Sequence, residues 1–189
     1  FLMEINMESA MQPLPTYDLH PEMITGYFGP ESIPVLETYY RVVQAHLERA
    51  VAALNEAESM VPERSRVIYE AETFGIRWFY HTARTLGNIY ESFRLTGKLK
   101  EWIEINQLLG PEEIEKGEKI LKRLHEIMLD EKQNALEAIP IAEKDPRIDT
   151  LHRGDHSFNG LIDMLHAKIK LIDQQIEEEI PLIEKRLRR

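Results

Sequence analysis

The densest set of chemically capable side chains on a predicted helix lies between residues 77 and 84. Arg77, His81 and Arg84 follow one another at steps of four and three residues, which places them on one helix face, and Glu70 is within reach of that face. A run of Trp, Phe and Tyr lies between them. Such a face is suited to bind an anionic group, or a sugar that stacks on an aromatic ring. The alternative is that the aromatic residues fill the core and the charged residues border it.

A second set of ionisable residues falls in a predicted loop over residues 144–157. Gly154 permits a sharp turn there, and binding residues are often carried on loops. The loop residues that we predict to contact a ligand or another domain are Arg147, His152, Asp155 and His156. Alternatively, Asp155 or Ser157 caps the next helix, and the acids only neutralise the arginines.

Helical bundles often hold a di-iron centre, which needs Glu-x-x-His on two helices and two further glutamates. No Glu precedes a histidine by three residues here, and the Asp-x-x-His pair on a predicted helix, Asp163 and His166, lacks the partners of a metal site. We therefore expect no metal and no cofactor. A phosphate-binding loop, a Gly-x-Ser-x-Gly elbow and a His-Glu-x-x-His motif are also missing, which argues against nucleotide-dependent enzymes, serine hydrolases and zinc proteases. Paired carboxylates of the glycosidase type cannot be judged from spacing.

Composition narrows the range of partners further. The 189 residues include 33 acidic and 23 basic ones, a formal net charge of -10 that repels phosphate backbones, so nucleic acid is not an expected partner. No apolar run approaches the roughly 20 residues of a membrane span, so no membrane is expected either. The absence of cysteine excludes disulfides and leaves the compartment open.

The first predicted helix has the most regular pattern of the sequence. It runs from Pro30, a residue favoured at the first helical position, to Val61, because Pro62 ends it. Its apolar stripe, at alternating three- and four-residue steps, is Ile33, Leu36, Tyr40, Val43, Leu47, Ala50, Leu54, Ala57 and Val61.

A second helix is predicted from about Val67 to Thr96 and Gly97, with Trp78 and Phe79 in the core and Ile89 widening its stripe. The residues 98–109 suit a short connecting helix. A third helix begins at Pro111 after Gly110 and fades around residues 139–141; Glu131 interrupts its stripe, which includes Gly117, Leu121, Leu124, Met128 and Ala135.

The fourth helix is predicted from Phe158 to Leu187, with a kink or break at Pro181. Its predicted apolar stripe is Phe158, Ile162, Leu165, Ile169, Ile172, Ile176, Ile180, Ile183 and Leu187. The expected fold is all-α, a bundle of four long antiparallel helices over residues 30–189. Residues 1–29 form a short N-terminal extension or linker with a short helix. Because the chain opens with Phe1 and lacks a signal-peptide pattern, we interpret it as a piece of a longer or processed polypeptide.

Two stretches carry a resemblance to a known family. Residues 27–40, Tyr-Phe-Gly-Pro-Glu-Ser-Ile-Pro-Val-Leu-Glu-Thr-Tyr-Tyr, and the later Asp-Pro-Arg-Ile at 145–148 with Phe158 and Lys-Ile-Lys-Leu-Ile at 168–172 resemble the α-helical C-terminal region of large bacterial glycoside-hydrolase-like proteins. In that family a TIM barrel precedes the helical domain. The resemblance covers about residues 22–187.

The resemblance implies that the catalytic carboxylates belong to a barrel outside this chain, so the chain alone is not expected to be catalytic. Its implied function is that of a non-catalytic accessory domain of a carbohydrate-active protein. Such a domain packs on the catalytic domain of the same parent protein or on a copy of itself, and a glycan is a further candidate ligand. The alternative is a free-standing helical module that recognises a partner helix. A helical-bundle metal enzyme ranks third because its ligands are missing.

Overall fold

The computed structural model describes residues 30–105, 110–144 and 160–188, all of whose regular secondary structure is helical. Along the chain the elements are η1 (Pro30–Ser32), α3 (Ile33–Glu58), η2 (Glu63–Ser65), α4 (Arg66–Ile105), α5 (Pro111–Lys144), α6 (Leu161–Gln174), η4 (Gln175–Glu179) and α7 (Ile180–Leu187). The predicted all-α bundle of long helices is thereby confirmed. The predicted extension over residues 1–29 lies outside the described residues.

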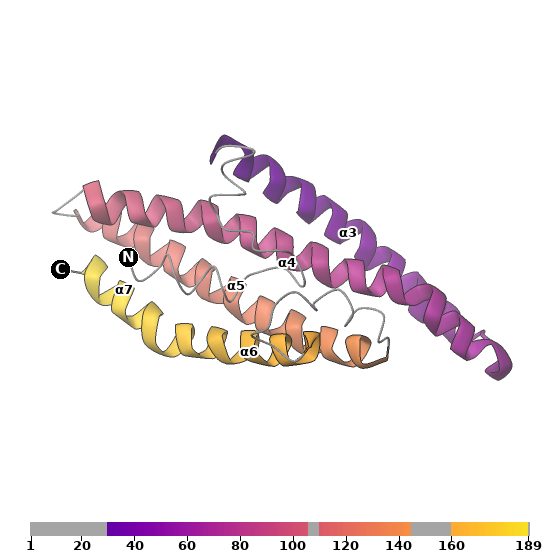
Figure 1. Ribbon diagram of the computed structural model, residues 1–189. Coiled ribbons are helices and arrows are strands. Elements are labelled where there is room, and N and C mark those ends of the chain that lie inside the picture. The colour runs from indigo at the N-terminus through magenta and orange to yellow at the C-terminus, as the bar shows by residue number, and fades with distance from the viewer. Residues whose placement is uncertain (1–29, 106–109, 145–159, 189) are drawn as a thin grey trace.

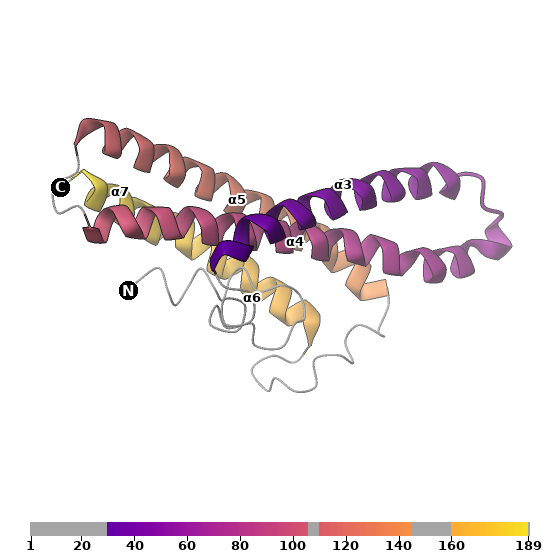
Figure 2. The ribbon, with the colours of Figure 1, turned by 90° about the horizontal axis from the view of Figure 1, so that it is seen from above.

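The helices are not equivalent in their packing. Helices α4 and α5 and the continuous rod of α6, η4 and α7 surround a common core, whereas α3 lies along the outer side of α4 (Figure 1). Figure 2, seen from above, shows the end of the α3 and α4 pair around η2 extending beyond α5 and α6. The fold is therefore a three-rod bundle to which a fourth helix is attached on one side.

Helix α3 runs antiparallel to α4, as ion pairs near its two ends show. Arg94 lies 2.6 Å from Glu37 near its start, and Arg77 lies 3.4 Å from Glu58 at its end. The predicted apolar stripe faces α4, where Tyr40 stacks on Tyr90 with ring centroids 5.5 Å apart. No residue of α3 is fully buried, because α4 covers it from one side only.

Helices α4 and α5 both continue past the residues at which we predicted them to end. Helix α4 passes through Gly97, so the separate short helix predicted over residues 98–109 is wrong as far as Ile105. Leu95 and Leu99 flank this glycine and are buried, and their burial outweighs the roughly 1 kcal/mol cost of glycine inside a helix. Helix α5 continues through Pro140 to Lys144 in the same way.

The fourth rod changes its helical type just before Pro181. Residues Gln175–Glu179 form a single π-helical turn between α6 and α7. Proline lacks a backbone N–H, and its ring collides with the carbonyl four residues earlier in a regular α-helix. A wider π turn relieves that collision. The helix continues through Pro181 without the predicted break, and its departure from α-helical geometry lies one turn earlier.

The buried residues of this rod differ from the predicted stripe. Its buried positions up to the π turn are Leu161, Leu165, Lys168, Ile172 and Gln175, whereas Ile162, Ile169 and Ile176 are only half-buried. In α4 the prediction for Trp78 is confirmed, since it is 9% exposed, but Phe79 is 63% exposed and the prediction for it is wrong. Trp78 lies on the side of α4 that faces α5 and α6, and Phe79, one residue on, is turned away by about 100°.

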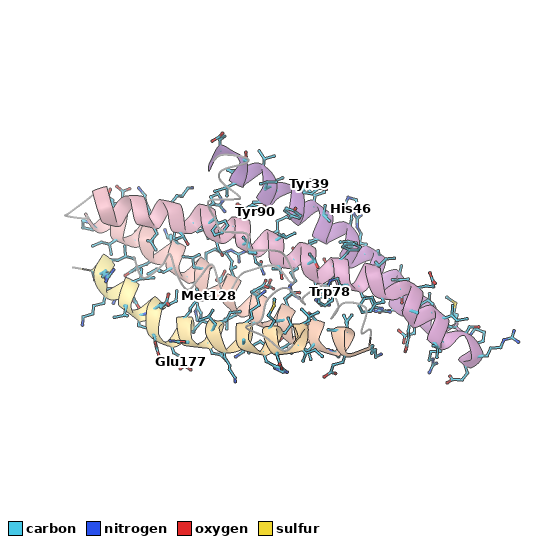
Figure 3. The ribbon with its side chains drawn as sticks, viewed as in Figure 1. Tyr39, His46, Trp78, Tyr90, Met128 and Glu177 are labelled. Carbon is cyan, nitrogen blue, oxygen red and sulfur yellow. The ribbon has the colours of Figure 1, made fainter. Side chains whose placement is uncertain are left out.

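The core consists of two apolar clusters, and polar residues lie between them. One cluster is centred on Leu124, Met128 and Ile172, and the other on Trp78 and Leu165. Figure 3 shows Met128 on α5 facing the fourth rod and Glu177 pointing away from the bundle. The polar residues between the two apolar clusters include a buried carboxylate, a buried lysine and a buried histidine.

Candidate functional site

A buried ion pair joins Glu131 of α5 to Lys168 of α6. Glu131 is 0% exposed and Lys168 is 6% exposed. The Lys168 ammonium donates to Glu131 Oε1. Thr85 donates its hydroxyl proton to the same oxygen at 2.6 Å, and Asn88 Nδ2 donates to Oε2 at 2.7 Å. Both oxygens of the buried carboxylate therefore accept hydrogen bonds, as burial of a charge requires.

His81 and Asn134 extend this set along the interior. Asn134 Nδ2 donates to the His81 carbonyl at 3.0 Å and to Thr85 Oγ1 at 2.9 Å, which uses both of its N–H groups. The amide oxygen of Asn134, 2.8 Å from His81 Nδ1, must then accept, so Nδ1 carries the proton of a neutral imidazole. We call Glu131, Lys168, Thr85, Asn88, Asn134 and His81 the buried polar cluster.

Burial lowers the pKa of His81 below its ordinary value. The hydrogen bond to Asn134 and the charges of Glu137 and Glu131 act in the opposite direction but do not restore it, and the charge of Arg84 lowers it further. Desolvation disfavours the imidazolium because the ring is enclosed between helices. His81 is therefore held neutral in the folded protein.

A second ion pair lies beside the buried polar cluster, between Arg84 and Asp130. The guanidinium donates to both carboxylate oxygens, at 2.6 and 3.1 Å, and also to Glu137 at 2.8 Å. Burial raises the pKa of Asp130, but the hydrogen bonds from Arg84 and Asn88 lower it by more, so the net shift is downward. Burial also lowers the pKa of Arg84, and its bonds to Asp130 reverse this to a net increase.

Helix α3 is connected to the same set of residues through Arg41. Arg41 donates to Asn88 Oδ1 at 2.8 Å and to Glu91 Oε2 at 2.7 Å. Arg123 of α5 donates to both oxygens of Glu91, at 2.7 and 3.0 Å. Burial raises the pKa of Glu91, and the bonds from Arg123 and Arg41 lower it by more. Asn88 thus links α3, α4 and α5 by direct hydrogen bonds.

The buried polar cluster has the chemistry of a structural ion pair. Two of its donors are engaged within the cluster: Thr85 donates to Glu131, and His81 Nδ1 donates to Asn134. Glu131 has no contact with solvent that would admit a substrate. The arrangement fixes the relative positions of the helices that it joins.

The predicted face of Arg77, His81 and Arg84 is divided among three environments. Arg77 donates to Asn55 of α3 at 2.5 Å, His81 lies in the core, and Arg84 turns to α5. Glu70 lies 3.8 Å from Lys144. The three side chains do not form one open surface, and a ligand role for them remains a prediction.

The remaining predicted site residues, Arg147, His152, Asp155 and His156, lie outside the described residues. Asp163 and His166 are both exposed on α6, as expected for surface side chains. Within the described ranges, no group of three or more His, Asp or Glu side chains is arranged to hold a metal ion. Of the helices the structure describes, none is long and apolar enough to cross a membrane.

An open groove lies between the start of α4 and the end of α5. Its volume is about 620 Å³, and its walls are mostly apolar. The apolar lining residues include Val67, Ala71, Phe74, Pro140 and Ile141. The charged lining residues form two ion pairs, Arg77 with Glu58 and Lys144 with Glu70. Because these charges are balanced, the groove favours an apolar occupant over a strongly charged one.

Residues that carry the interior chemistry were missed by the sequence reasoning. We treated Glu131 as an interruption of an apolar stripe, and Lys168 as part of a resemblance. The signal was their position: each occupies a core-facing site of its helix, next to Met128 and Leu165 respectively. Opposite charges on the buried faces of two neighbouring helices predict an ion pair.

Comparisons with protein families, with characterised proteins and with solved structures find no match for this chain.

Proposed function

We propose that this chain is a non-catalytic helical accessory domain that binds a partner domain through the free end of its α3 and α4 hairpin. We call residues 55–79 the distal arm. Following the sequence resemblance, the partner that we propose is the catalytic barrel of the same carbohydrate-active polypeptide. The observation that supports this function most directly is the exposed apolar surface of the distal arm.

Five large apolar side chains of the distal arm are exposed. Their exposed fractions are 75% for Met60, 78% for Val67, 65% for Ile68, 37% for Ile76 and 63% for Phe79. Ile68, Ile76 and Phe79 follow one another at helical spacing, so they share one side of α4. Single exposed apolar residues are ordinary, but five at one end of a hairpin, one of which, Val67, also lines an apolar groove, are typical of a protein interface.

The interior chemistry supports a binding role over a catalytic one. Glu131, the most buried acid among the residues that the structure describes, is neutralised by a lysine and accepts hydrogen bonds from two further donors. Buried polar side chains that bond to one another hold the helices in place, as expected in a domain that acts by binding through a rigid surface. A helical domain without its own acid–base site fits the accessory role that the resemblance implies.

The alternative is a free-standing module whose distal arm recognises a helix of another protein. The apolar groove of about 620 Å³ favours this candidate, because amphipathic helices commonly insert apolar side chains into such grooves. The two functions differ in what precedes Phe1. A coding sequence for several hundred residues with alternating strands and helices supports the accessory domain, and a start codon immediately upstream supports the free module.

Binding to the separately produced upstream barrel is the direct test. We expect the change of Ile68 and Phe79 to Glu to weaken binding in isothermal titration calorimetry by at least about tenfold, because it places charge in an apolar contact. The matched control changes Leu129 and Leu136, exposed apolar residues of α5, to Glu. Equal effects of the two variants, or hydrolysis of a glycan by this chain alone, would contradict the proposal.

A further inference from the structure

The outer face of the first half of α3 carries no charge. From Pro34 to Ala45 the exposed residues are Pro34, Val35, Thr38, Tyr39, Val42 and Ala45, which we call the neutral face. Val35 is 68%, Tyr39 59% and Val42 53% exposed, and Figure 3 labels Tyr39 on this helix. In a chain of which 30% is charged, three exposed turns without a charge indicate a surface that another element covers.

Helix α5 provides a comparison of equal length. From Glu112 to Arg123 its exposed residues are Glu112, Glu115, Lys116, Lys119, Lys122 and Arg123, all of them charged. Both segments span twelve residues at the start of a long helix. The neutral face is therefore a property of this part of α3 and not of the surface as a whole.

A second copy of the chain is a poor occupant because the neutral face is small. Twelve helical residues are about 17 Å long, and a helix with its side chains is about 10–12 Å wide, so the face offers roughly 200 Å². Stable dimers bury about 800 Å² on each partner. A segment of the same chain needs far less area, since it does not lose the translational and rotational freedom of a separate molecule.

We propose that residues 19–28 of the same chain pack on the neutral face. This segment, Leu-His-Pro-Glu-Met-Ile-Thr-Gly-Tyr-Phe, joins α3 at Gly29 and Pro30, one turn before the neutral face begins. Its only acid is Glu22, and it provides five large apolar side chains, Leu19, Met23, Ile24, Tyr27 and Phe28. Ten extended residues reach about 33 Å, which is enough to run back along three helical turns. Gly26 and Gly29 allow the chain to reverse.

This packing would use a surface separate from the distal arm, so it goes beyond the accessory role and does not depend on it. The occupied face would attach the N-terminal segment to α3 and fix the direction in which the chain leaves the bundle.

Disulfide trapping tests the contact. Because the sequence has no cysteine, only the two introduced cysteines can form a disulfide. A variant with Glu22→Cys and Ala45→Cys keeps the five large apolar residues of the segment and the large side chains Val35, Tyr39 and Val42 of the neutral face. We expect it to form an intramolecular disulfide under mild oxidation while the protein stays monomeric in light scattering. Circular dichroism of each variant checks that the helices are intact.

Two matched controls carry the same cysteine pair. One adds Ile24→Ser and Phe28→Ser in the segment, and the other adds Val35→Ser and Tyr39→Ser in the neutral face. Each removes two apolar side chains, and we expect disulfide formation to slow by about tenfold. Rates equal to that of the parent pair would overturn the proposal, since chance encounters of the segment would then explain the bond. Disulfide-linked dimers as the main product would overturn it in favour of a second copy on the neutral face.

Discussion

Helix α5 has 34 residues and fully buries ten of them, whereas α3 has 26 residues and fully buries none. Both helices have a regular apolar stripe. The difference is in their neighbours: α5 lies between α4 and the fourth rod, and α3 contacts α4 on one side. An apolar stripe in the sequence indicates that one face of a helix packs against the protein. The number of helices that pack on that face decides how much of the stripe is buried.

The same contrast holds for charged residues. In the bundle, Glu131 and Lys168 are enclosed with both charges compensated. Along α3 the ion pairs are partly exposed; in the pair of Arg94 and Glu37 the side chains are 29% and 18% exposed. Removal of one partner of an ion pair should therefore lower the free energy of unfolding strongly in the bundle and only slightly along α3.

The largest effect is expected from Glu131→Ala. It leaves the Lys168 ammonium buried without its carboxylate, and breaking a buried ion pair from one side costs about 3–5 kcal/mol of the free energy of unfolding. Urea unfolding followed by circular dichroism measures this loss. A loss under about 1 kcal/mol would show that water reaches Lys168 in solution and would remove the distinction between the two regions.

Two further variants control for this experiment. Glu37→Ala breaks the partly exposed pair with Arg94 and is expected to cost about 0–1 kcal/mol. The double change Glu131→Leu and Lys168→Met replaces the buried pair by apolar side chains and should be close to neutral, because the cost of burying two charges is removed together with their attraction.

The second prediction compares two leucines of the apolar stripes. Leu124 of α5 is 0% exposed, so Leu124→Ala should cost about 2–5 kcal/mol through lost burial and the cavity left behind. Leu47 of α3 is only half-buried, and Leu47→Ala should cost roughly 1 kcal/mol, since less apolar area is returned to water. Thermal and urea unfolding of both variants decide the matter. Equal losses would indicate that another element covers α3.

The sequence predicted the helices well because their stripes and their Gly-Pro starts are local signals. Helix α5 begins at Pro111, where the Gly-Pro pair placed it, and the irregularity before Pro181 follows from the chemistry of proline. Local signals also caused the errors at Gly97 and Pro140. Both residues disfavour helix, yet buried neighbours such as Leu99 and Ala142 hold the helix across them.

The interior site could not be predicted because it depends on relations between helices. Periodicity placed Glu131 on the buried side of its helix, but one helix alone does not reveal the lysine that faces it. His81 was predicted as a surface binding residue and is 5% exposed, because α5 covers its side of α4 with Asn134. For the loop candidates from Arg147 to His156, the ligand-binding hypothesis remains a prediction.

The third prediction concerns pH. His81 has a folded pKa below its ordinary value of 6.5, so the unfolded chain binds the proton more readily, and stability falls as the pH drops below about 6.5. Glu91 and Asp130 have folded pKa values below their ordinary 4.5 and 3.8; their stabilisation is present above those values and is lost as the pH falls through the lower folded values.

The measurement is the free energy of unfolding between pH 7 and pH 3. Wild-type protein should lose stability in two stages, the first from the histidine and the second from the acids. His81→Gln, which retains a donor for Asn134, should flatten the first stage and leave the second. Stability that rises on acidification from pH 7 to pH 5 would contradict the assignment of a neutral, buried His81.

The smallest effects are expected from two glycines that sit in the two contrasting regions. A methyl group at Gly75, in the distal arm, would meet no atom within 4 Å, whereas at Gly117 of α5 it would come within 3.0 Å of both terminal methyl groups of Leu187. Gly75→Ala should therefore stabilise the protein by about 0.4–1 kcal/mol, because alanine has less freedom to lose on folding. Gly117→Ala gains the same entropy but must displace Leu187, which is 1% exposed and has little room to move. A net loss of about 1 kcal/mol or more in the free energy of unfolding is therefore expected.

The denaturation midpoints of the two variants show directly whether each substitution stabilises or destabilises the protein. Stabilisation by Gly117→Ala would mean that α7 can shift away from α5 at little cost, and the packing contrast between the bundle and the hairpin would then be weaker at that end of the molecule.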